Sequence, residues 1–361
     1  MMVGANRQEL FSGTRAIPGA QSVKLAKLET YLAHNIPGFI GPLQIAQFRG
    51  GQSNPTYLLQ AASGKYVLRR KPEGKLLPSA HAVEREYRVT LALAAIGFPV
   101  PHPLVLCEDV TVLGTPFYVM DHVDGRIFWE PHAPGLTDGE RSRLFQSLND
   151  TIAGLHLIDY RTLGLENFGR PEGYVMRQVK RWSEQYRASQ TCKIDEMDRL
   201  IEALPLMVPQ QTQSSLIHGD FRLDNCVVDP TQPRVIAVLD WELSTLGDPI
   251  ADFTYQLMQW HMPADFSGGG VGSLVGKEQE APGLPSIEDY VHSYCRRRGI
   301  EGIPQLDMYL AYNFFRLAAI FQGIAGRVRD GTATNPHAEL MAQQVEPMAV
   351  KAWEFARKAG A

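Results

Sequence analysis

The first third of the chain alternates apolar and polar residues in short runs, the pattern of half-buried β-strands. These runs lie at 43–48, 56–61, 65–70, 104–109 and 116–123. Apolar residues at helical spacing predict helices over 22–36 and 81–97, and the second of these stops at Gly97. From about residue 122 helical patterns dominate. Strands followed by helices predict an α+β protein with a small, mostly β first lobe and a larger, mostly helical second lobe.

One loop between apolar runs carries the chemistry. The segment IHGDFRLDN covers 217–225, an apolar strand resumes at once, and a second strand over 235–239 leads to Asp240. Phosphoryl transfer asks a protein mainly for positioning and charge neutralisation. Asp220 would orient and deprotonate a hydroxyl, while Asn225 and Asp240 would hold magnesium against nucleotide phosphates. The alternative is an ordinary loop with a capping aspartate and a turn asparagine.

Composition narrows the class of protein. The chain has 361 residues, 44% of them hydrophobic and 20% charged, which is typical of a globular protein. The net charge of −4 favours neither nucleic acid nor an anionic membrane as a partner. The apolar runs are too short for a membrane span, and the N-terminus lacks the apolar core of a secretory signal. Four scattered cysteines argue against disulfides and predict a reducing cytoplasm.

A glycine-rich turn lies between the first two strand-like runs. In the segment 48–59, Gly50 and Gly51 allow a backbone to approach phosphates closely, and Ser53 and Asn54 carry hydrogen-bond donors. These features predict a hairpin that covers nucleotide phosphates. The alternative is that these residues form an ordinary β-hairpin turn with no role in binding phosphates.

The loop motif resembles that of the aminoglycoside phosphotransferase and choline kinase-like superfamily, which reads H-G-D-x-x-x-x-N. The resemblance runs from about residue 38 to about residue 330. Within the superfamily the chain looks most like the kinase-like domain associated with acyl-CoA dehydrogenases and its free-standing bacterial relatives. It implies a protein-kinase-like two-lobed fold that uses ATP and Mg²⁺. The expected parts are a loose tail over 1–20, a nucleotide-covering lobe over 21–121, and a lobe over 122–361 with the catalytic loop, metal site and acceptor site.

The resemblance also implies roles in the strand over 66–72. Alternation places Val67 and Arg69 on one face, where Val67 would cover the adenine and Arg69 would reach the α- and β-phosphates. Most kinases have lysine at this position, and Lys71 lies two residues further along the same face. The alternative is a solvated, basic strand edge. Arg222, two residues after Asp220, would neutralise the migrating phosphoryl group by analogy with an arginine finger.

A carboxylate from the helix over 81–97 should orient Arg69. The expected apolar face of this helix comprises Val83, Tyr87, Thr90, Leu91 and Ala94. Glu84 and Glu86 flank that face on opposite sides, so periodicity does not choose between them, and the resemblance favours Glu86. The resemblance also implies that Met120 lines the rear of the adenine pocket and that the backbone of Asp121 to Val123 pairs with adenine.

Four further residues are predicted to have structural roles. Asp248 and Asp252 should cap a helix or hold the catalytic loop, and His218 should support that loop by hydrogen bonding. His156 should be a buried histidine near a helix end. The segment 262–286 is rich in Gly, Ser and Pro, which predicts a mobile loop or linker.

The acceptor is harder to derive. Basic residues gather at Arg177, Lys180, Arg181 and Arg316, which either form solvated surface or bind an anionic acceptor. The resemblance implies phosphorylation of a hydroxyl on an acyl chain carried by coenzyme A, by a monomer or homodimer. The alternatives are a kinase of an amino alcohol, amino sugar or aminoglycoside, a nucleotide-binding pseudokinase, and a metal-dependent hydrolase. The hydrolase lacks the additional His and Asp clusters that a two-metal site needs.

Overall fold

The structure is a computed structural model that describes residue 8 and residues 11–16, 22–50, 54–72, 82–266, 271–333 and 337–361. Its contacts separate the chain into two compact units. The N-terminal unit comprises Met1–Glu130 and Leu223–Ser244, and the C-terminal unit comprises Pro131–Arg222 and Thr245–Ala361. The boundary after Arg222 divides the 217–225 motif, so that Asp220 and Asn225 belong to different units.

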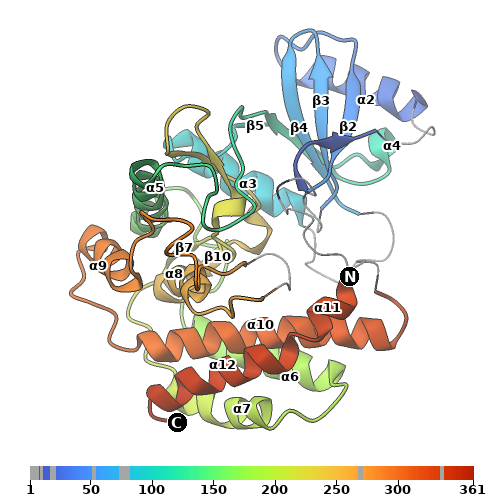
Figure 1. The fold of residues 1–361 in the computed structure, drawn as a ribbon. Coiled ribbons are helices and arrows are strands. Elements are labelled where there is room, and N and C mark those ends of the chain that lie inside the picture. The colour runs from blue at the N-terminus through green and yellow to red at the C-terminus, as the bar shows by residue number, and fades with distance from the viewer. Residues whose placement is uncertain are drawn as a thin grey trace. The chain divides into compact units, whose positions relative to one another are not determined.

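The N-terminal unit is built on a six-stranded antiparallel sheet with the order β1-β2-β3-β4-β6-β5 (Figure 1). Its strands are β1 (Thr14–Arg15), β2 (Gln44–Phe48), β3 (Thr56–Ala61), β4 (Gly64–Arg70), β5 (Pro103–Cys107) and β6 (Phe117–Asp121). Its helices are α2 (Ser22–Asn35), α3 (Val83–Ala95) and the short α4 (Val110–Leu113). The strands from β2 to β6 and the helices α2 and α3 confirm the elements expected from the sequence.

Alternation along β4 gives the sheet two distinct buried faces. Leu68 packs in a cluster with residues of α2, whereas Val67 packs in another cluster with Val83 of α3. In the ladder with β6, Val67 lies opposite Met120 and Arg69 lies opposite Tyr118. Because directly paired residues share a face, all four lie on the side that faces α3, as expected for Val67 and Arg69.

The apolar face predicted for α3 was wrong by about one residue. The helix buries Val83, Glu86, Val89, Thr90 and Leu93, whereas Leu91 is 42% exposed. The hydrophobic pattern alone misplaced the face because a glutamate with strong partners occupies a buried position. This rotation turns Glu86 toward the sheet.

Part of the segment expected to be a loose tail is ordered by pairing. Thr14 and Arg15 form β1, which adds to the edge of the sheet beside β2. The Gln8 amide donates to the carbonyl of Ile127 and accepts from the N–H of Trp129. Backbone groups at a sheet edge favour such pairing, which composition does not reveal.

A hairpin from later in the chain completes the N-terminal unit. Strands β8 (Cys226–Val228) and β9 (Val235–Val238) pair antiparallel, between the short 3-10 helices η1 (Leu223–Asn225) and η2 (Trp241–Leu243). Arg126 exchanges two backbone hydrogen bonds with Val228, at 2.7 and 2.8 Å. The sequence predicts a lobe over 122–361 that includes this hairpin. By their contacts, residues 223–244 group with the N-terminal unit.

The C-terminal unit is mostly helical. Its helices are α5 (Asp138–Leu157), α6 (Tyr174–Ser189), α7 (Asp195–Met207), α8 (Pro249–Leu257), η3 (Met258–Trp260), α9 (Ile287–Arg298), α10 (Leu306–Arg329), α11 (Ala338–Ala342) and α12 (Val345–Lys358). Strands β7 (Ser215–Ile217) and β10 (Thr245–Gly247) pair antiparallel and flank the loop that starts at His218. Helix α10 contacts α6, α8 and α12, and most of its residues are buried. The α+β class is confirmed.

The described part of the Gly-, Ser- and Pro-rich segment packs against the helices. Val271 and Leu274 are each 3% exposed, and the side chain of Gln259 donates to the carbonyl of Val271 at 2.6 Å. Val271 and Leu274 are thus anchored on the helices, while the mobility expected for the segment stays a prediction. None of the helices in the described ranges has the length and apolar character of a membrane span.

Candidate active site

Arg69 is the centre of a buried ionic cluster in the N-terminal unit. It is 7% exposed near the end of β4. Its Nε lies 3.0 Å from Oε2 of Glu86, and its Nη2 lies 2.8 Å from Oδ1 of Asp240. Burial alone would lower the pKa of Arg69, but the charges of Glu86 and Asp240 raise it well above the ordinary value. One guanidinium thus joins the two carboxylates that the sequence singled out.

Glu86 is fully buried and accepts hydrogen bonds from three side chains. Besides Arg69, the Tyr118 hydroxyl donates to Oε2 and the Asn54 amide donates to Oε1, each at 3.0 Å. Burial raises the pKa of the Glu86 carboxyl, although Arg69 opposes this shift. Glu84 pairs with Lys71 at 2.8 Å, where its side chain is 40% exposed. The choice that the sequence left open is therefore resolved in favour of Glu86 as the partner of Arg69.

Asp240 lies between β9 and η2 in a left-handed backbone conformation, with φ 64° and ψ 59°. This region is uncommon for residues other than glycine, and it is often retained at functional positions. The carbonyl of Asn225 accepts the N–H of Leu239 at 2.8 Å, which ties the end of η1 to the residue before Asp240. The two predicted metal ligands therefore lie on segments of the same unit that are joined by a backbone hydrogen bond.

The donor set at this place suits a magnesium ion. Carboxylate oxygens of Glu86, Asp240 and Glu242 lie within 4.8 Å of one another. The part of Asn225 as a metal ligand stays a prediction. Mg²⁺ prefers oxygen ligands and binds through one or two carboxylates together with phosphates. Glu86 is fully buried and accepts three hydrogen bonds, whereas the Asp240 side chain is 27% exposed, so Asp240 and Glu242 are the carboxylates that fit the ion better.

The phosphate hairpin is described only in part. Gly51 and Ser53 lie outside the described residues, so their predicted contacts with phosphates stay predictions. A Cβ at Gly50 would lie 2.4 Å from the Trp129 ring, so this position needs glycine for packing. The Asn54 amide donates to Glu86 and, at 3.2 Å, to Glu242. Asn54 thus links the start of β3 to the carboxylate cluster.

The predicted adenine contacts lie on β4 and β6. Val67 and Met120 are both buried, face each other across the two strands, and pack with Val83 of α3. Asp121 ends β6, and its N–H donates to the carbonyl of His102 at 2.9 Å. Val123 follows beyond the strand end and is partly buried.

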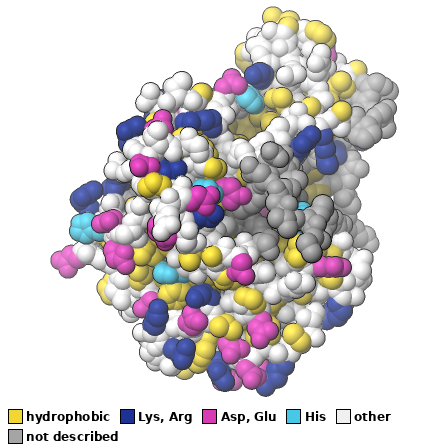
Figure 2. All heavy atoms as spheres, viewed as in Figure 1, with side chains coloured by type: hydrophobic (Ala, Val, Ile, Leu, Met, Phe, Trp, Pro, Cys, Tyr) yellow, Lys and Arg dark blue, Asp and Glu magenta, His cyan; other side chains and the backbone are white. Residues whose placement is uncertain are grey.

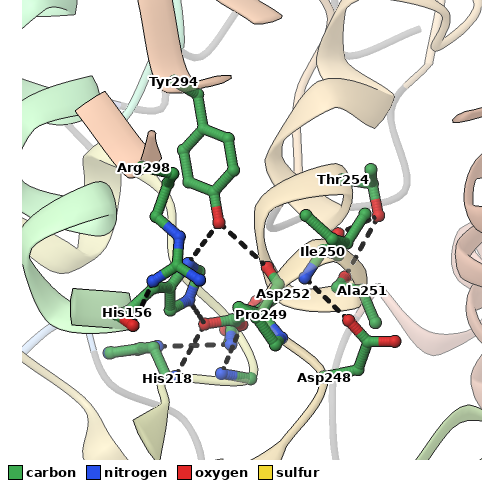
Figure 3. A network of polar contacts seen from close by, with 12 residues as sticks. His156, His218, Asp248, Pro249, Ile250, Ala251, Asp252, Thr254, Tyr294 and Arg298 are labelled. Atoms are coloured by element: carbon green, nitrogen blue, oxygen red, sulfur yellow. Dashed lines mark hydrogen bonds and ion pairs between the residues drawn. The ribbon is translucent and has the colours of Figure 1, made fainter. Parts of the chain in front are cut away.

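In the C-terminal unit, Asp252 of α8 holds the loop that carries Asp220 by its backbone (Figure 3). Its Oδ2 accepts the N–H of His218 at 2.8 Å, and its Oδ1 accepts the N–H of Gly219 at 2.7 Å. The N–H of Asp220 donates to Nδ1 of His218 at 3.2 Å. Asp248 caps α8 by accepting the N–H of Ile250. The structural roles predicted for Asp248, Asp252 and His218 are confirmed.

His156 supports Asp252 from α5. Its Nε2 lies 3.1 Å from Oδ2 of Asp252, and its Nδ1 lies 2.7 Å from the hydroxyl of Tyr294 on α9 (Figure 3). Burial lowers the pKa of His156, so the ring is neutral near pH 7. Burial would raise the pKa of Asp252, but its hydrogen bonds lower it below the ordinary value. His156 is buried as expected, and it also takes part in the loop support.

Asp220, the predicted base, accepts two hydrogen bonds from Arg222. The Nε of Arg222 donates to Oδ1 at 2.9 Å, and Nη2 donates to Oδ2 at 3.0 Å. Their side chains are 19% and 10% exposed, respectively. Tyr255 lies beside them, and burial together with the Asp220 charge raises the pKa of its phenol. The positive charge of Arg222 therefore compensates the negative charge of the Asp220 carboxylate.

The four basic residues predicted to bind the acceptor have different surroundings. Arg177 donates to the carbonyls of Arg170 and Glu172. Lys180 and Arg181 are exposed, and Arg181 lies over the Trp182 ring. Arg316 is buried, with 7% of its surface exposed, and donates to the carbonyl of Gly219.

Sequence reasoning missed three residues of these clusters, namely Tyr118, Glu242 and Tyr255. Tyr118 precedes Met120 by two positions on the same strand, so alternation from Met120 would have placed it on the Arg69 face. Glu242 lies two residues after Asp240, and this proximity is the signal that could have found it. Nothing in the local pattern indicates that Tyr255 of α8 lies beside Asp220, because that contact joins residues 35 positions apart.

Comparison with known proteins identifies relatives over most of the chain. The Phosphotransferase enzyme family (APH) matches residues 44–308. Mouse acyl-CoA dehydrogenase family member 10 is 43% identical over 351 residues, which cover 96% of this chain and 32% of that protein. Human acyl-CoA dehydrogenase family member 11 is 42% identical over 337 residues, covering 92% of this chain and 43% of that protein. The chain thus spans less than half the length of these curated relatives.

Solved structures show the same fold. A "putative aminoglycoside phosphotransferase" from Ralstonia eutropha JMP134 is 42% identical, with a TM-score of 0.83, over 92% of this chain and 98% of that one. Aminoglycoside phosphotransferase APH(4)-Ia, in a ternary complex with AMP-PNP and hygromycin B, has a TM-score of 0.59 at 15% identity. That match covers 93% of this chain and 99% of the other. At this identity the second match concerns the fold alone, which is the predicted kinase-like one.

Proposed function

Because this chain belongs to the Phosphotransferase enzyme family, we propose that it transfers the γ-phosphoryl group of ATP, with Mg²⁺, to the hydroxyl of a small molecule. The observation that carries the proposal is the double ion pair of Arg69. Its guanidinium binds Glu86 at 3.0 Å and Asp240 at 2.8 Å, so a phosphate-binding cation and a metal-binding carboxylate share one buried cluster. A protein that only needed a stable sheet would gain little from burying three charges together.

The N-terminal unit supplies the nucleotide contacts in this proposal. Arg69, oriented by Glu86, contacts the phosphates, and Val67 and Met120 line the adenine pocket. The hairpin covers the phosphates, and the β6 end offers backbone groups to adenine. The residues proposed for these last two roles are Gly50, Gly51, Ser53, Asn54, Asp121 and Val123.

Asn225 and Asp240 would hold the metal ion. When bound, Mg²⁺ neutralises the charge that develops on the phosphates during transfer. Asp240 carries an ion pair with Arg69 and a side chain that is 27% exposed, so it offers a second lone-pair direction toward an ion. The backbone hydrogen bond from Leu239 to Asn225 holds the segments that carry the two proposed ligands together.

Asp220 would act as the base and Arg222 as its charge partner. Each carboxylate oxygen accepts one hydrogen bond from Arg222, and Tyr255 also bonds to Asp220. As the hydroxyl proton passes to Asp220, Arg222 is left with an uncompensated positive charge. That charge then suits the negative phosphoryl group, which assigns Arg222 a role in the same step.

We propose a hydroxyacyl-CoA or a related anionic alcohol as the acceptor. The proposal is supported by relatives named for acyl-CoA dehydrogenases, whose matches cover 92–96% of this chain. The exposed Lys180 and Arg181, with Arg177 beside them on α6, suit the phosphates of coenzyme A. On the face drawn in Figure 2, Lys and Arg side chains are interspersed with Asp and Glu, which does not favour a nucleic-acid partner.

The rival acceptor is an amine-bearing alcohol. The name of the Ralstonia structure favours it, since that protein is 42% identical to this chain. Cationic acceptors call for carboxylates or aromatic faces around the hydroxyl. The carboxylate of Asp220 is instead neutralised by Arg222, which favours an anionic acceptor.

The test is ADP release by the purified protein with Mg-ATP across a panel of acceptors. The panel contains 3- and 4-hydroxyacyl-CoAs, choline, homoserine, fructosamine and kanamycin. Stimulation by a hydroxyacyl-CoA alone supports the whole proposal. Stimulation by an amine-bearing alcohol keeps the kinase and refutes the acceptor. Binding of ATP without stimulation by any member of the panel favours the nucleotide-binding pseudokinase.

A further inference from the structure

The peptide bond before Asp220 is held at both of its polar atoms. Its carbonyl, from Gly219, accepts Nη2 of Arg316 at 2.9 Å. Its N–H, from Asp220, donates to Nδ1 of His218 at 3.2 Å. Gly219 has a φ of 84°, a conformation that glycine adopts freely, so the backbone here has no steric preference that would fix the plane. Hydrogen bonds must therefore fix the orientation of this peptide.

Two helices share this task. Asp252 of α8 accepts the N–H of Gly219, and Figure 3 shows its carboxylate between His156 and the backbone of His218. Asp252 thereby holds the peptide that precedes Gly219. Arg316 of α10 holds the next peptide, which carries Asp220 itself. Rotation of that second peptide would swing the Asp220 side chain, and Arg316 is the group on its carbonyl oxygen.

The surroundings of Arg316 are unusual for a cation. It is 7% exposed, and its Cζ lies 4.9 Å from the centre of the Tyr255 ring. In the part of the chain that the structure describes, its Nε has no hydrogen-bond partner. The pKa of Arg316 is raised by nearby tyrosines and by the charge of Asp220, against the effect of burial. Burying a guanidinium is unfavourable unless its donors are hydrogen-bonded. The Gly219 carbonyl is the hydrogen-bond acceptor that this arginine reaches.

We propose that Arg316 is a positioning residue, which orients Asp220 by fixing the Gly219 carbonyl. This proposal rests on the proposed function and refines it, because it removes Arg316 from the set of acceptor contacts. A buried guanidinium that donates to the loop acts on catalysis through Asp220. A contact with the acceptor's phosphates would instead need an exposed cation, as Lys180 and Arg181 are.

The experiment compares three variants of the full chain. Arg316→Met removes the donors at similar side-chain length, and Arg316→Lys keeps a charged donor. Arg327→Met is the matched control, because Arg327 lies eleven residues further along α10 and is exposed. We expect Arg316→Met to lower kcat about 100-fold, the scale of a misplaced catalytic group. The KM values for Mg-ATP and acceptor should stay within about twofold, and Arg316→Lys should recover part of kcat.

Two further readouts separate positioning from a general loss of structure. In the background of Asp220→Asn, Arg316→Met should cause no additional loss, because the group that it positions is already disabled. Hydrogen exchange of the peptide that spans residues 216–222 should speed up in Arg316→Met and not in Arg327→Met.

Three results would overturn the proposal. A raised acceptor KM with unchanged kcat would make Arg316 a contact with the acceptor. Losses that multiply in the Asp220→Asn background would show that it acts independently of Asp220. Unchanged exchange of the 216–222 peptide would show that it does not hold the loop. If the wild-type chain transfers to no acceptor while the exchange still responds to Arg316→Met, the positioning role survives and the proposed function fails.

Discussion

Replacement of Glu86 by alanine is the sharpest test of the buried cluster. It leaves Arg69 at 7% exposure with Asp240 as its remaining carboxylate partner. It also removes the acceptor for Tyr118 and one of the two carboxylates to which Asn54 donates. At the observed 3.0 Å, the gross attraction between Arg69 and Glu86 is about 5–6 kcal/mol for an effective dielectric constant near 20. Removal of one member of a buried pair destabilises proteins by about 3–5 kcal/mol. Because Asp240 remains, we expect about 3 kcal/mol.

Glu84→Ala is the matched control, two residues earlier on the same helix. Its ion pair with Lys71 has a similar distance, 2.8 Å, but its side chain is 40% exposed. A solvent-exposed pair contributes about 0.5 kcal/mol. Both substitutions introduce alanine into α3, so helix propensity affects them in the same direction.

The assay is urea unfolding of both variants, followed by tryptophan fluorescence, with ATP affinity measured in parallel. The expected result is a large loss of unfolding free energy and weaker ATP binding for Glu86→Ala only. If the two variants lose equal stability, within about 0.5 kcal/mol, burial does not set the strength of these pairs and the reasoning fails. Equal ATP affinity would refute the role of Glu86 in orienting Arg69.

Three further outcomes are expected. Asp220→Asn should lower kcat roughly 10³-fold and leave the ATP dissociation constant within about twofold by calorimetry, whereas equal loss of both would make Asp220 a structural residue. Removal of Mg²⁺ with EDTA should abolish transfer, and Asp240→Asn should raise the Mg²⁺ concentration for half-maximal rate, more than Glu84→Gln does. Burial lowers the pKa of His156, so the unfolded chain binds its proton more readily below about pH 6.5. Stability should therefore fall as pH drops below that value, by at most about 1.4 kcal/mol per pH unit, and His156→Gln should flatten this slope in urea titrations at several pH values.

The local patterns of the sequence were sufficient for the elements of the N-terminal sheet. The runs at 56–61 and 65–70 became β3 and β4 within one residue, because period-two alternation reports directly which side chains of a strand face a core. The loop motif over 217–225 could also be recognised from the sequence alone. Its chemistry depends on residue types at short spacing, and the apolar strands on either side hold that spacing in space.

The pairing of Arg69 shows what the pattern left undetermined. Glu84 and Glu86 both flank the predicted apolar face of α3, and a rotation of the helix by one residue decides which of them is buried. That rotation follows from packing against Val67, Tyr118 and Met120, which lie on β4 and β6 outside the helix itself. The carboxylate's partners then offset the burial of its charge.

The sequence by itself determined the strand alternation, the catalytic loop and the residue types for phosphoryl transfer. Tertiary structure alone decided that residues 223–244 join the N-terminal unit, since this depends on backbone bonds such as those between Arg126 and Val228. It also decided that Arg316 is buried and donates to the Gly219 carbonyl, whereas Lys180 is exposed to solvent. Local periodicity reports which face of an element is apolar. The hydrogen-bond or ion-pair partner of each polar side chain depends on which other elements pack against it, and local periodicity does not report that.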